Sequence, residues 1–170
     1  FLANIISGVS LAEETKSAEF NFNKYDFWVD KCQLLRKNKQ YSEALIACEQ
    51  AISLKPKKDN IQLWLARGDS LLQLSQYSEA AVSYNWVLKQ DKKNVPALVQ
   101  KCSALLGLGN YKDALQSCNL ALESKKDKQD WDNIKQVKNY WGNIPLSKVL
   151  YIKGSVLRRQ EKYDEAISLF

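Results

Sequence analysis

One pattern of residues recurs four times along this chain of 170 residues, and it constrains the fold more than any other feature. Each copy is marked by a tyrosine, with an alanine three residues after it and a leucine six residues before it. A small residue, either glycine or cysteine, stands nine residues before the tyrosine. The marker tyrosines of the first three copies are 36 and 34 residues apart. A fixed register that returns at such intervals is typical of helical repeat proteins. The four copies contain, in this order, Cys32, Leu35, Tyr41 and Ala44; Gly68, Leu71, Tyr77 and Ala80; Cys102, Leu105, Tyr111 and Ala114; and Gly154, Leu157, Tyr163 and Ala166.

Each copy has the apolar spacing of two amphipathic helices separated by a short break. In residues 61–90, the clearest copy, the break falls at residues 74–76. A helix pair of this length cannot bury its apolar face alone, so neighbouring pairs are expected to stack into one continuous core. We expect Ser42 and Ser78 to mark the starts of second helices, followed by acidic side chains in the first turn.

The repeated unit resembles the tetratricopeptide repeat (TPR) family over residues 25–128 and 147–170. The residues that carry the resemblance are Trp64, Gly68, Leu71, Tyr77, Ala80 and Tyr84, with Pro56 ending the first repeat. The resemblance implies an all-α, right-handed superhelix of antiparallel helix pairs. The predicted organisation is an N-terminal segment at 1–24, TPR 1 at 25–60, TPR 2 at 61–94, TPR 3 at 95–128, an insert at 129–146 and a truncated TPR 4 at 147–170.

Two segments fall outside the repeats. Residues 1–24 begin with an apolar stretch that we expect to form a helix, although a remnant signal peptide cleaved after Ala12 is an alternative. The insert at 129–146 has apolar residues near helical spacing and then Gly142 and Pro145, so a helix is expected there too. Its apolar residues either pack back onto the repeats, which we favour, or form a partner surface.

The fourth repeat stops part-way through its second helix, at Phe170. A solenoid normally ends in a repeat with a polar outer face. We therefore expect the natural protein to continue beyond this residue. The alternative is an oligomer that covers the uncapped edge.

Four cysteines occupy equivalent places in the first and third repeats. Cys32 and Cys102 hold the small position, while Cys48 and Cys118 stand where the second repeat has Tyr84. We favour the interpretation that they are buried free thiols. The alternative is a disulfide within each repeat, Cys32–Cys48 or Cys102–Cys118, formed in an oxidising compartment.

The composition gives little support for catalysis. The chain has no histidine, which removes the commonest general base and the commonest metal ligand. The cysteines form no CxxC motif, and no nucleophile or phosphate-binding motif is present. Most acidic residues stand where helices are expected to begin, where they complement the helix dipole. We therefore predict no enzyme activity, no cofactor and no metal.

The net charge of +6 is the only feature that suggests nucleic acid. Nucleic-acid binders usually gather their basic residues on one face. Here the densest basic groups, at residues 55–58, 89–93 and 125–128, fall at the ends of expected helices. Cations at those positions complement the helix dipole, so we do not expect a nucleic-acid partner.

The family resemblance places a ligand groove along the first helices of successive repeats. That groove would hold an extended peptide or an amphipathic helix of another protein. The alternative is that the N-terminal segment or the insert of this chain fills the groove in cis. The candidate partner-binding residues, carried over from the resemblance, are Val29, Gln33, Leu65, Asp69, Leu72, Val99, Gln100, Ser103, Leu106, Tyr151 and Ser155.

One subclass of the family grips the C-terminal carboxylate of chaperone tails with a clamp of lysine, asparagine and arginine. The matching positions here hold Val29, Gln33, Ala66, Pro96 and Gln100. Shifting the register by one repeat gives Leu65, Asp69, Gln100, Lys148 and Ile152. Neither set supplies the clamp, so we predict that this chain does not bind an acidic chaperone tail.

Together these features favour a protein–protein interaction scaffold in a larger protein or assembly, expected in the cytoplasm. The alternative is a regulatory or anchoring arm of an enzyme or membrane protein whose other domain lies outside this sequence.

Overall fold

A computed structural model describes residues 24–54, 60–126 and 146–169 of the chain. All of the regular structure in these ranges is helical. The chain divides into two compact units, residues 1–59 and residues 60–170. The helices predicted at 1–24 and in the insert at 129–146 lie almost entirely outside the described residues. Among the described helices, none is long and apolar enough to cross a membrane.

The first unit contains a helix at residues 24–37 and helix α2, Tyr41–Leu54. A short turn at residues 38–40 joins the two. The buried side chains of α2 are Ala44, Ala47, Cys48 and Ala51, which follow the spacing of one helix face. Tyr25 and Cys32 are the most deeply buried residues of the other helix.

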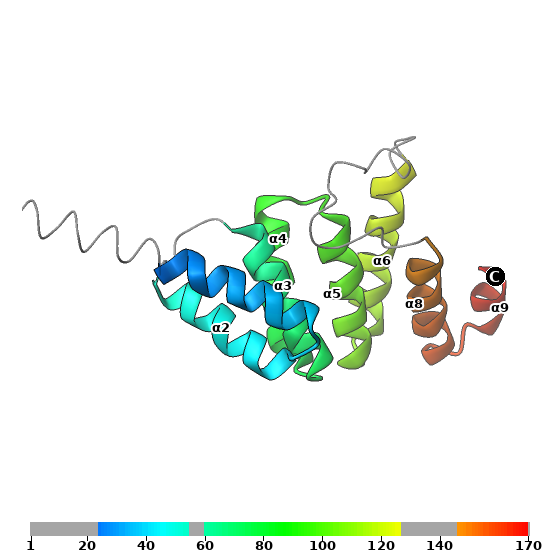
Figure 1. Cartoon of the computed structure of the whole chain (residues 1–170). Helices are drawn as coiled ribbons and strands as arrows, with labels where there is room; N and C mark the ends of the chain where they lie inside the picture. The colour runs from blue at the N-terminus through cyan, green and yellow to red at the C-terminus, as the bar shows by residue number, and fades with distance from the viewer. Residues whose placement is uncertain (1–23, 55–59, 127–145, 170) are drawn as a thin grey trace, which may run out of the picture. The chain divides into compact units, whose positions relative to one another are not determined.

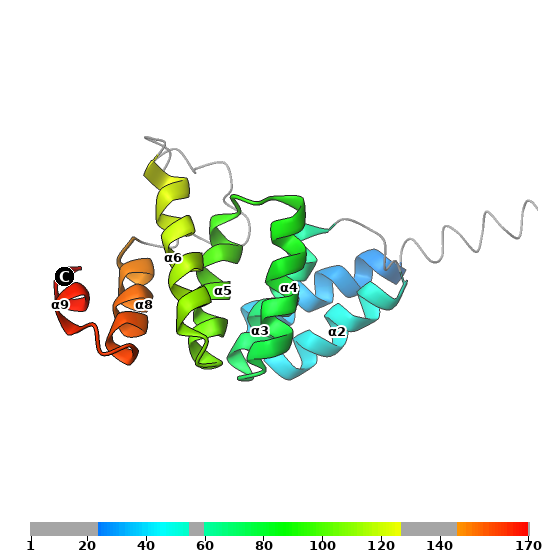
Figure 2. The same ribbon diagram turned by 180° about the vertical axis from the view of Figure 1, so that it is seen from behind.

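The second unit is a row of helices that lie side by side in both views (Figure 1, Figure 2). Each helix contacts the next in the chain, and α3 also contacts α5, as α5 contacts α8. The all-α solenoid of antiparallel helix pairs predicted from the sequence is confirmed. The helices are α3 (Ile61–Gln73), α4 (Tyr77–Gln90), α5 (Val95–Gly107), α6 (Tyr111–Lys126), α8 (Leu146–Arg159) and α9 (Tyr163–Ile167).

The contact between the two helices of a repeat depends on the small position. A Cβ atom built on Gly68 of α3 would lie 2.6 Å from Cε1 and 2.9 Å from Cζ of Tyr84 of α4. Tyr84 and Ala80 are both fully buried. The tyrosine ring therefore packs directly against the α3 backbone at Gly68, where glycine leaves room for it.

The turn inside each repeat has one conformation throughout. The residue two before the marker tyrosine has a positive φ in all four repeats: Lys39, Ser75, Gly109 and Glu161, at 62°, 60°, 74° and 61°. The following N–H bonds a carbonyl five residues back, as in Gln76 N to Leu71 O at 2.9 Å. This is the hydrogen bond of a Schellman motif, which ends the first helix with a left-handed residue.

Ser42 and Ser78 mark the starts of α2 and α4, as predicted, but each lies one residue inside its helix and not at the cap position. Helix α4 begins at Tyr77, so Ser78 lies inside it, and Gln76 at the cap position makes no side-chain cap bond. Ser42 likewise falls inside α2. The acidic residues Glu43 and Glu79 do lie in the first turns of these helices, as predicted. Side-chain caps occur instead at α3 and α5, where Asn60 accepts from Leu63 N and Asn94 accepts from Ala97 N.

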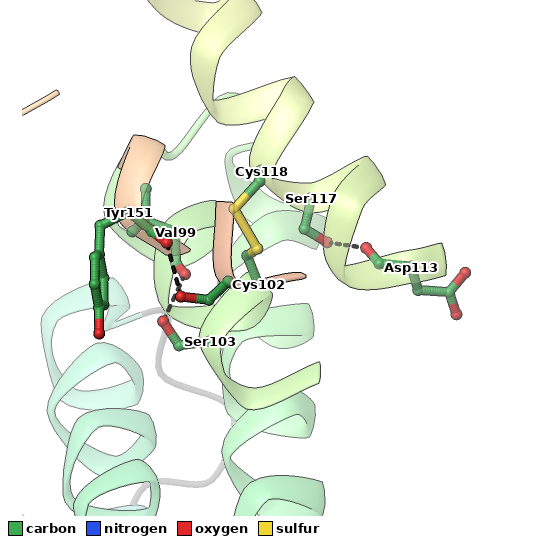
Figure 3. Close-up of a disulfide and its surroundings, with 8 residues drawn as sticks. Val99, Cys102, Ser103, Asp113, Ser117, Cys118 and Tyr151 are labelled. Carbon is green, nitrogen blue, oxygen red and sulfur yellow. Dashed lines mark hydrogen bonds between the residues drawn. A yellow bond between two sulfur atoms is a disulfide. The ribbon is translucent and has the colours of Figure 1, made fainter. Parts of the chain in front are cut away.

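The interpretation of the cysteines as free thiols is wrong. Cys32 is bonded to Cys48 and Cys102 to Cys118, and the described residues include no free cysteine. The Cα atoms of the pairs lie 5.0 and 5.5 Å apart, within the range that disulfides require. Figure 3 shows the second bond joining α5 to α6, beside Ser117, which donates to the Asp113 carbonyl.

Candidate functional site

A cleft of about 660 Å³ opens between α5 and α8, at the end of α5 that leads into the turn. From α5 come Ser103 and Leu106, three residues apart and therefore on one helix face. From α8 come Tyr151 and Ser155, four residues apart. The direct contact between α5 and α8 holds these two faces in place within the second unit. These four predicted residues are thus brought together on one concave surface.

The side chains that line the cleft differ in their solvent exposure and in their hydrogen bonding. Tyr151 is 65% exposed, whereas Leu106 is half-buried. The two serine hydroxyls donate to carbonyls of their own helices, Ser103 to Val99 O at 3.3 Å and Ser155 to Tyr151 O at 2.9 Å. A partner would therefore find apolar and aromatic surface here rather than unsatisfied hydroxyl groups.

The rim of the cleft includes residues that were not predicted. Tyr77 lies against Gly107, where an added Cβ would be 2.8 Å from the tyrosine ring. Tyr77 follows directly on the turn of the second repeat, and its contact with Gly107 at the end of α5 places it at the border of the cleft. Recurrence of the tyrosine next to each turn was the available signal. The lining residues that the family resemblance does not assign to the groove are Tyr77, Gly107, Leu108, Gly109, Tyr111 and Arg158, whereas Arg159 is a position that it does assign there.

The charged side chains that line this cleft are all positive. Arg158 and Arg159 in the last turn of α8 are both exposed. No aspartate or glutamate is among the described residues that line the cleft. Its potential is therefore positive at the arginine end and close to neutral along Leu106 and Tyr151.

Several predicted site residues are buried instead of facing a groove. Leu65 and Val99 are 1% and 0% exposed. Val99 belongs to the core cluster that also contains Val149 and Val156 of α8. Their burial leaves these side chains without surface to offer a partner, so their role in the structure is packing.

Asp69 and Gln100 are brought together, but inside the fold. Gln100 Nε2 donates to Asp69 Oδ1 at 3.2 Å, and both side chains are buried. The bond links α3 to α5, the first helices of two successive repeats. Buried polar groups need such partners, because leaving one unsatisfied costs about 1–3 kcal/mol. The pair is therefore better explained as a connection between repeats than as a contact site.

The remaining predicted residues do not line the cleft. Leu72 is half-buried on α3. Val29 is buried and Gln33 is half-buried in the helix at 24–37 of the first unit.

A second and larger hollow, about 870 Å³, lies on the other side of α5. Leu98, Lys101 and Leu105 line it, and they project from the side of α5 opposite to Ser103 and Leu106. Its rim mixes lysines with Asp113 and Glu123. The mixed charge and the absence of any predicted site residue make it the weaker candidate for a partner.

The side chains of the α5–α8 cleft are suited to contact with a polypeptide. No group of three or more histidine, cysteine, aspartate or glutamate side chains in the described part of the chain could hold a metal ion. The α5–α8 cleft presents tyrosine, leucine, serine and arginine side chains. Such a set can hold a polypeptide segment by burial, stacking and charge.

Comparison with known proteins adds evidence on the fold. A family model described as anaphase-promoting complex, cyclosome, subunit 3 matches residues 37–119. A solved TPR domain of Arabidopsis OM64 has a TM-score of 0.63 at 20% identity, with 81% of this chain and 98% of that chain covered. The fold is that of a tetratricopeptide-repeat domain.

Other TPR structures superpose equally well. MamA from Desulfovibrio magneticus RS-1 has a TM-score of 0.70 at 15% identity, covering 87% of this chain and 72% of that chain. The TPR2B domain of yeast Sti1, solved in a complex with an Hsp70 peptide, has a TM-score of 0.63 at 15% identity, covering 80% and 98%. A search of curated proteins finds no match. At these identities the likeness establishes the TPR fold alone.

Proposed function

We propose that this chain is a protein–protein interaction module that holds an amphipathic helix or peptide of a partner in the cleft between α5 and α8. The single observation that carries the proposal is that one open cleft is lined by Ser103 and Leu106 of α5 together with Tyr151 and Ser155 of α8. These are residues that the family resemblance assigns to a ligand groove. Other proteins with the TPR fold support the assignment, since the Sti1 domain is solved with a peptide.

The chemistry of the cleft defines the kind of segment it fits. Leu106 and the exposed Tyr151 offer apolar and aromatic contact area, which is where interface energy concentrates. Arg158 and Arg159 favour carboxylates at one end of the bound segment. The fitting partner therefore has an apolar helix face or strand with acidic residues beyond one end. Because exposed charges contribute little, the apolar contacts supply most of the affinity.

Introducing a charge inside the cleft tests the proposal. The variants Leu106→Glu and Tyr151→Glu place a carboxylate where the apolar contact forms. Removing a central contact of this kind costs about 2 kcal/mol or more, so binding should weaken by about 30-fold. The control is Val82→Glu, which makes the same change at a residue of α4 that is 59% exposed and lies outside the cleft.

The measurement has two stages. Partners are first captured from cells with the wild-type chain, and the bound segment is mapped by crosslinking from residue 106. A synthetic copy of that segment is then titrated against all the variants, with circular dichroism to confirm that each is folded. Loss of binding in both cleft variants and retention in the α4 control support the proposal. Equal binding by all of them overturns it and moves the partner surface elsewhere.

A further inference from the structure

We propose that Cys32–Cys48 and Cys102–Cys118 are structural disulfides acquired in an oxidising compartment, and that each one locks together the two helices of a single repeat. This inference is independent of the α5–α8 cleft. It rests on where the cysteines stand in the repeat, on their burial and on the short chain that each bond closes.

The cysteines replace a specific packing pair. In the second repeat the small position and the aromatic position hold Gly68 and Tyr84, whose contact joins α3 to α4. In the first and third repeats both positions are cysteine, and each pair is bonded. No repeat combines a cysteine with a glycine or an aromatic residue at these two places. Replacement of both partners together is expected of a bonded pair, whereas two independent apolar residues would vary separately.

Free thiols would fill this place poorly. Two cysteine side chains occupy less volume than a tyrosine ring, and unfilled space between helices is destabilising. A disulfide compensates by holding the two helices at a fixed short distance. The Cα separations of 5.0 and 5.5 Å are within the usual range for such a bond.

Burial makes these bonds structural rather than redox-sensing. All four cysteines are 0% exposed. Redox-sensor cysteines are solvent-accessible, because an oxidant or reductant must reach the sulfur. Here a reductant reaches the sulfur atoms only when a repeat opens. Once formed, the bonds should therefore persist in the folded chain.

Each bond closes a local loop. The sequence separation is 16 residues in both cases, spanning the turn of one repeat. Cross-linking a loop of this size restricts the unfolded chain and so favours the folded one. The repeats that carry the bonds are thereby stabilised individually, without a cross-link from one repeat to another.

The oxidation that forms a disulfide indicates the kind of compartment in which this chain folds. Two thiols lose two protons and two electrons to form one disulfide, and the electrons pass to a protein disulfide by thiol–disulfide exchange. Structural disulfides persist in secretory, periplasmic or extracellular environments and are rare where glutathione keeps thiols reduced. The two bonds therefore favour such an environment, in contrast to the cytoplasmic location expected from the sequence.

Counting thiols in the natural protein tests the inference directly. Cells are quenched in acid, and the chain is denatured without reductant and alkylated. The mass of the purified chain then reports how many cysteines were free. We expect none to be alkylated before reduction and four after it. Four free thiols in the natural protein overturn the inference.

A swap that copies the second repeat tests the stabilising role. The variant with Cys32→Gly, Cys48→Tyr, Cys102→Gly and Cys118→Tyr carries the Gly68–Tyr84 pairing in place of both bonds. Reduction should lower the melting temperature of the wild-type chain on the order of 10 °C. The melting temperature of the swap variant should be unaffected by reductant. An unchanged wild-type melting temperature, with reduction verified by alkylation, contradicts the stabilising role.

If the swap variant does not fold, alanine pairs replace it. The variants Cys32→Ala/Cys48→Ala and Cys102→Ala/Cys118→Ala remove one bond each without introducing a ring. Each should melt below the oxidised wild-type chain and show less sensitivity to reductant. If either variant melts at the wild-type temperature, the disulfide that it lacks does not stabilise the chain.

Discussion

Of the glycines Gly68, Gly107 and Gly109, Gly68 leaves the least room for a side chain, because the Tyr84 ring packs against it, and a single methyl group tests this contact. Gly68→Ala places a Cβ 2.6 Å from Cε1 of a fully buried ring that cannot move into solvent. Alanine gains about 1 kcal/mol in helix propensity. Overpacking costs about 1–3 kcal/mol, so we expect a net loss of stability. Urea unfolding should show a lower midpoint with an unchanged m-value.

The control for that measurement is Gln73→Ala, an exposed position on the same helix α3. It should leave stability unchanged or raise it slightly, since it gains helix propensity without a new contact. Gly68→Ala at or above wild-type stability would show that α3 and α4 separate easily.

At the left-handed positions of the turns, introducing a glycine should raise the stability of the chain. Ser75 has a φ of 60° where the third repeat has Gly109 at 74°. A non-glycine residue in this conformation costs about 1–2 kcal/mol, and replacing it with glycine relieves that strain. The greater conformational freedom of glycine in the unfolded chain offsets part of this gain in stability. Ser75→Gly should therefore stabilise the chain by about 0.5–1 kcal/mol, measured by thermal or urea unfolding. The paired variant Gly109→Ala should destabilise it, and a shift of both in the same direction contradicts the argument.

At the scale of a helix, the asparagine caps set where α3 and α5 begin. Asn94 Oδ1 accepts from Ala97 N at 3.1 Å, and its Nδ2 donates to Asp91 Oδ2 at 3.1 Å. Removing such a cap costs about 1 kcal/mol. Asn94→Ala should lower the free energy of unfolding by that amount, while Asn94→Ser, an uncharged capping residue, should retain most of it. Gln76→Ala is the matched control, because Gln76 makes no side-chain cap bond; an equal loss there would assign the effect to something other than capping.

The repeat register was sufficient to predict these helices and their pairing, but not how each one starts. A serine followed by an acidic residue is a common start signal, which led to Ser42 and Ser78. In the structure the second helix follows directly from the left-handed turn, so Tyr77 is already helical and the first bond runs from Ala80 N to Gln76 O. Asn60 and Asn94 stand just before α3 and α5, and asparagine at that place is itself a sequence signal for a helix start.

At the scale of the whole molecule, periodicity indicates which face of a helix is apolar but not how far the next helix covers it. Val99 and Leu106 fall on neighbouring parts of the same predicted groove, yet Val99 is fully buried in the cluster with Val149 while Leu106 borders the cleft. Tertiary packing separates them. The cysteines show a similar limit, because the positions of Cys102 and Cys118 were clear from the register, whereas their oxidation state was not.

A last prediction concerns which TPR ligands this chain excludes. The yeast Sti1 domain with the same fold is solved with an Hsp70 peptide, but the positions that match a chaperone-tail clamp here include Val29, Ala66 and Gln100. All three are buried, and none carries a positive charge. The exposed Arg158 lies outside those positions, and a surface ion pair contributes only about 0–1 kcal/mol.

We therefore expect no micromolar binding of an acidic chaperone C-terminal peptide in a calorimetric titration. Sti1 TPR2B serves as the positive control, and the same peptide with its carboxylates neutralised controls for apolar contacts. Micromolar affinity that disappears on neutralisation would show that Arg158 and Arg159 act as a clamp of a different kind. Binding that survives neutralisation but is lost in Leu106→Glu would instead assign the peptide to the apolar part of the α5–α8 cleft.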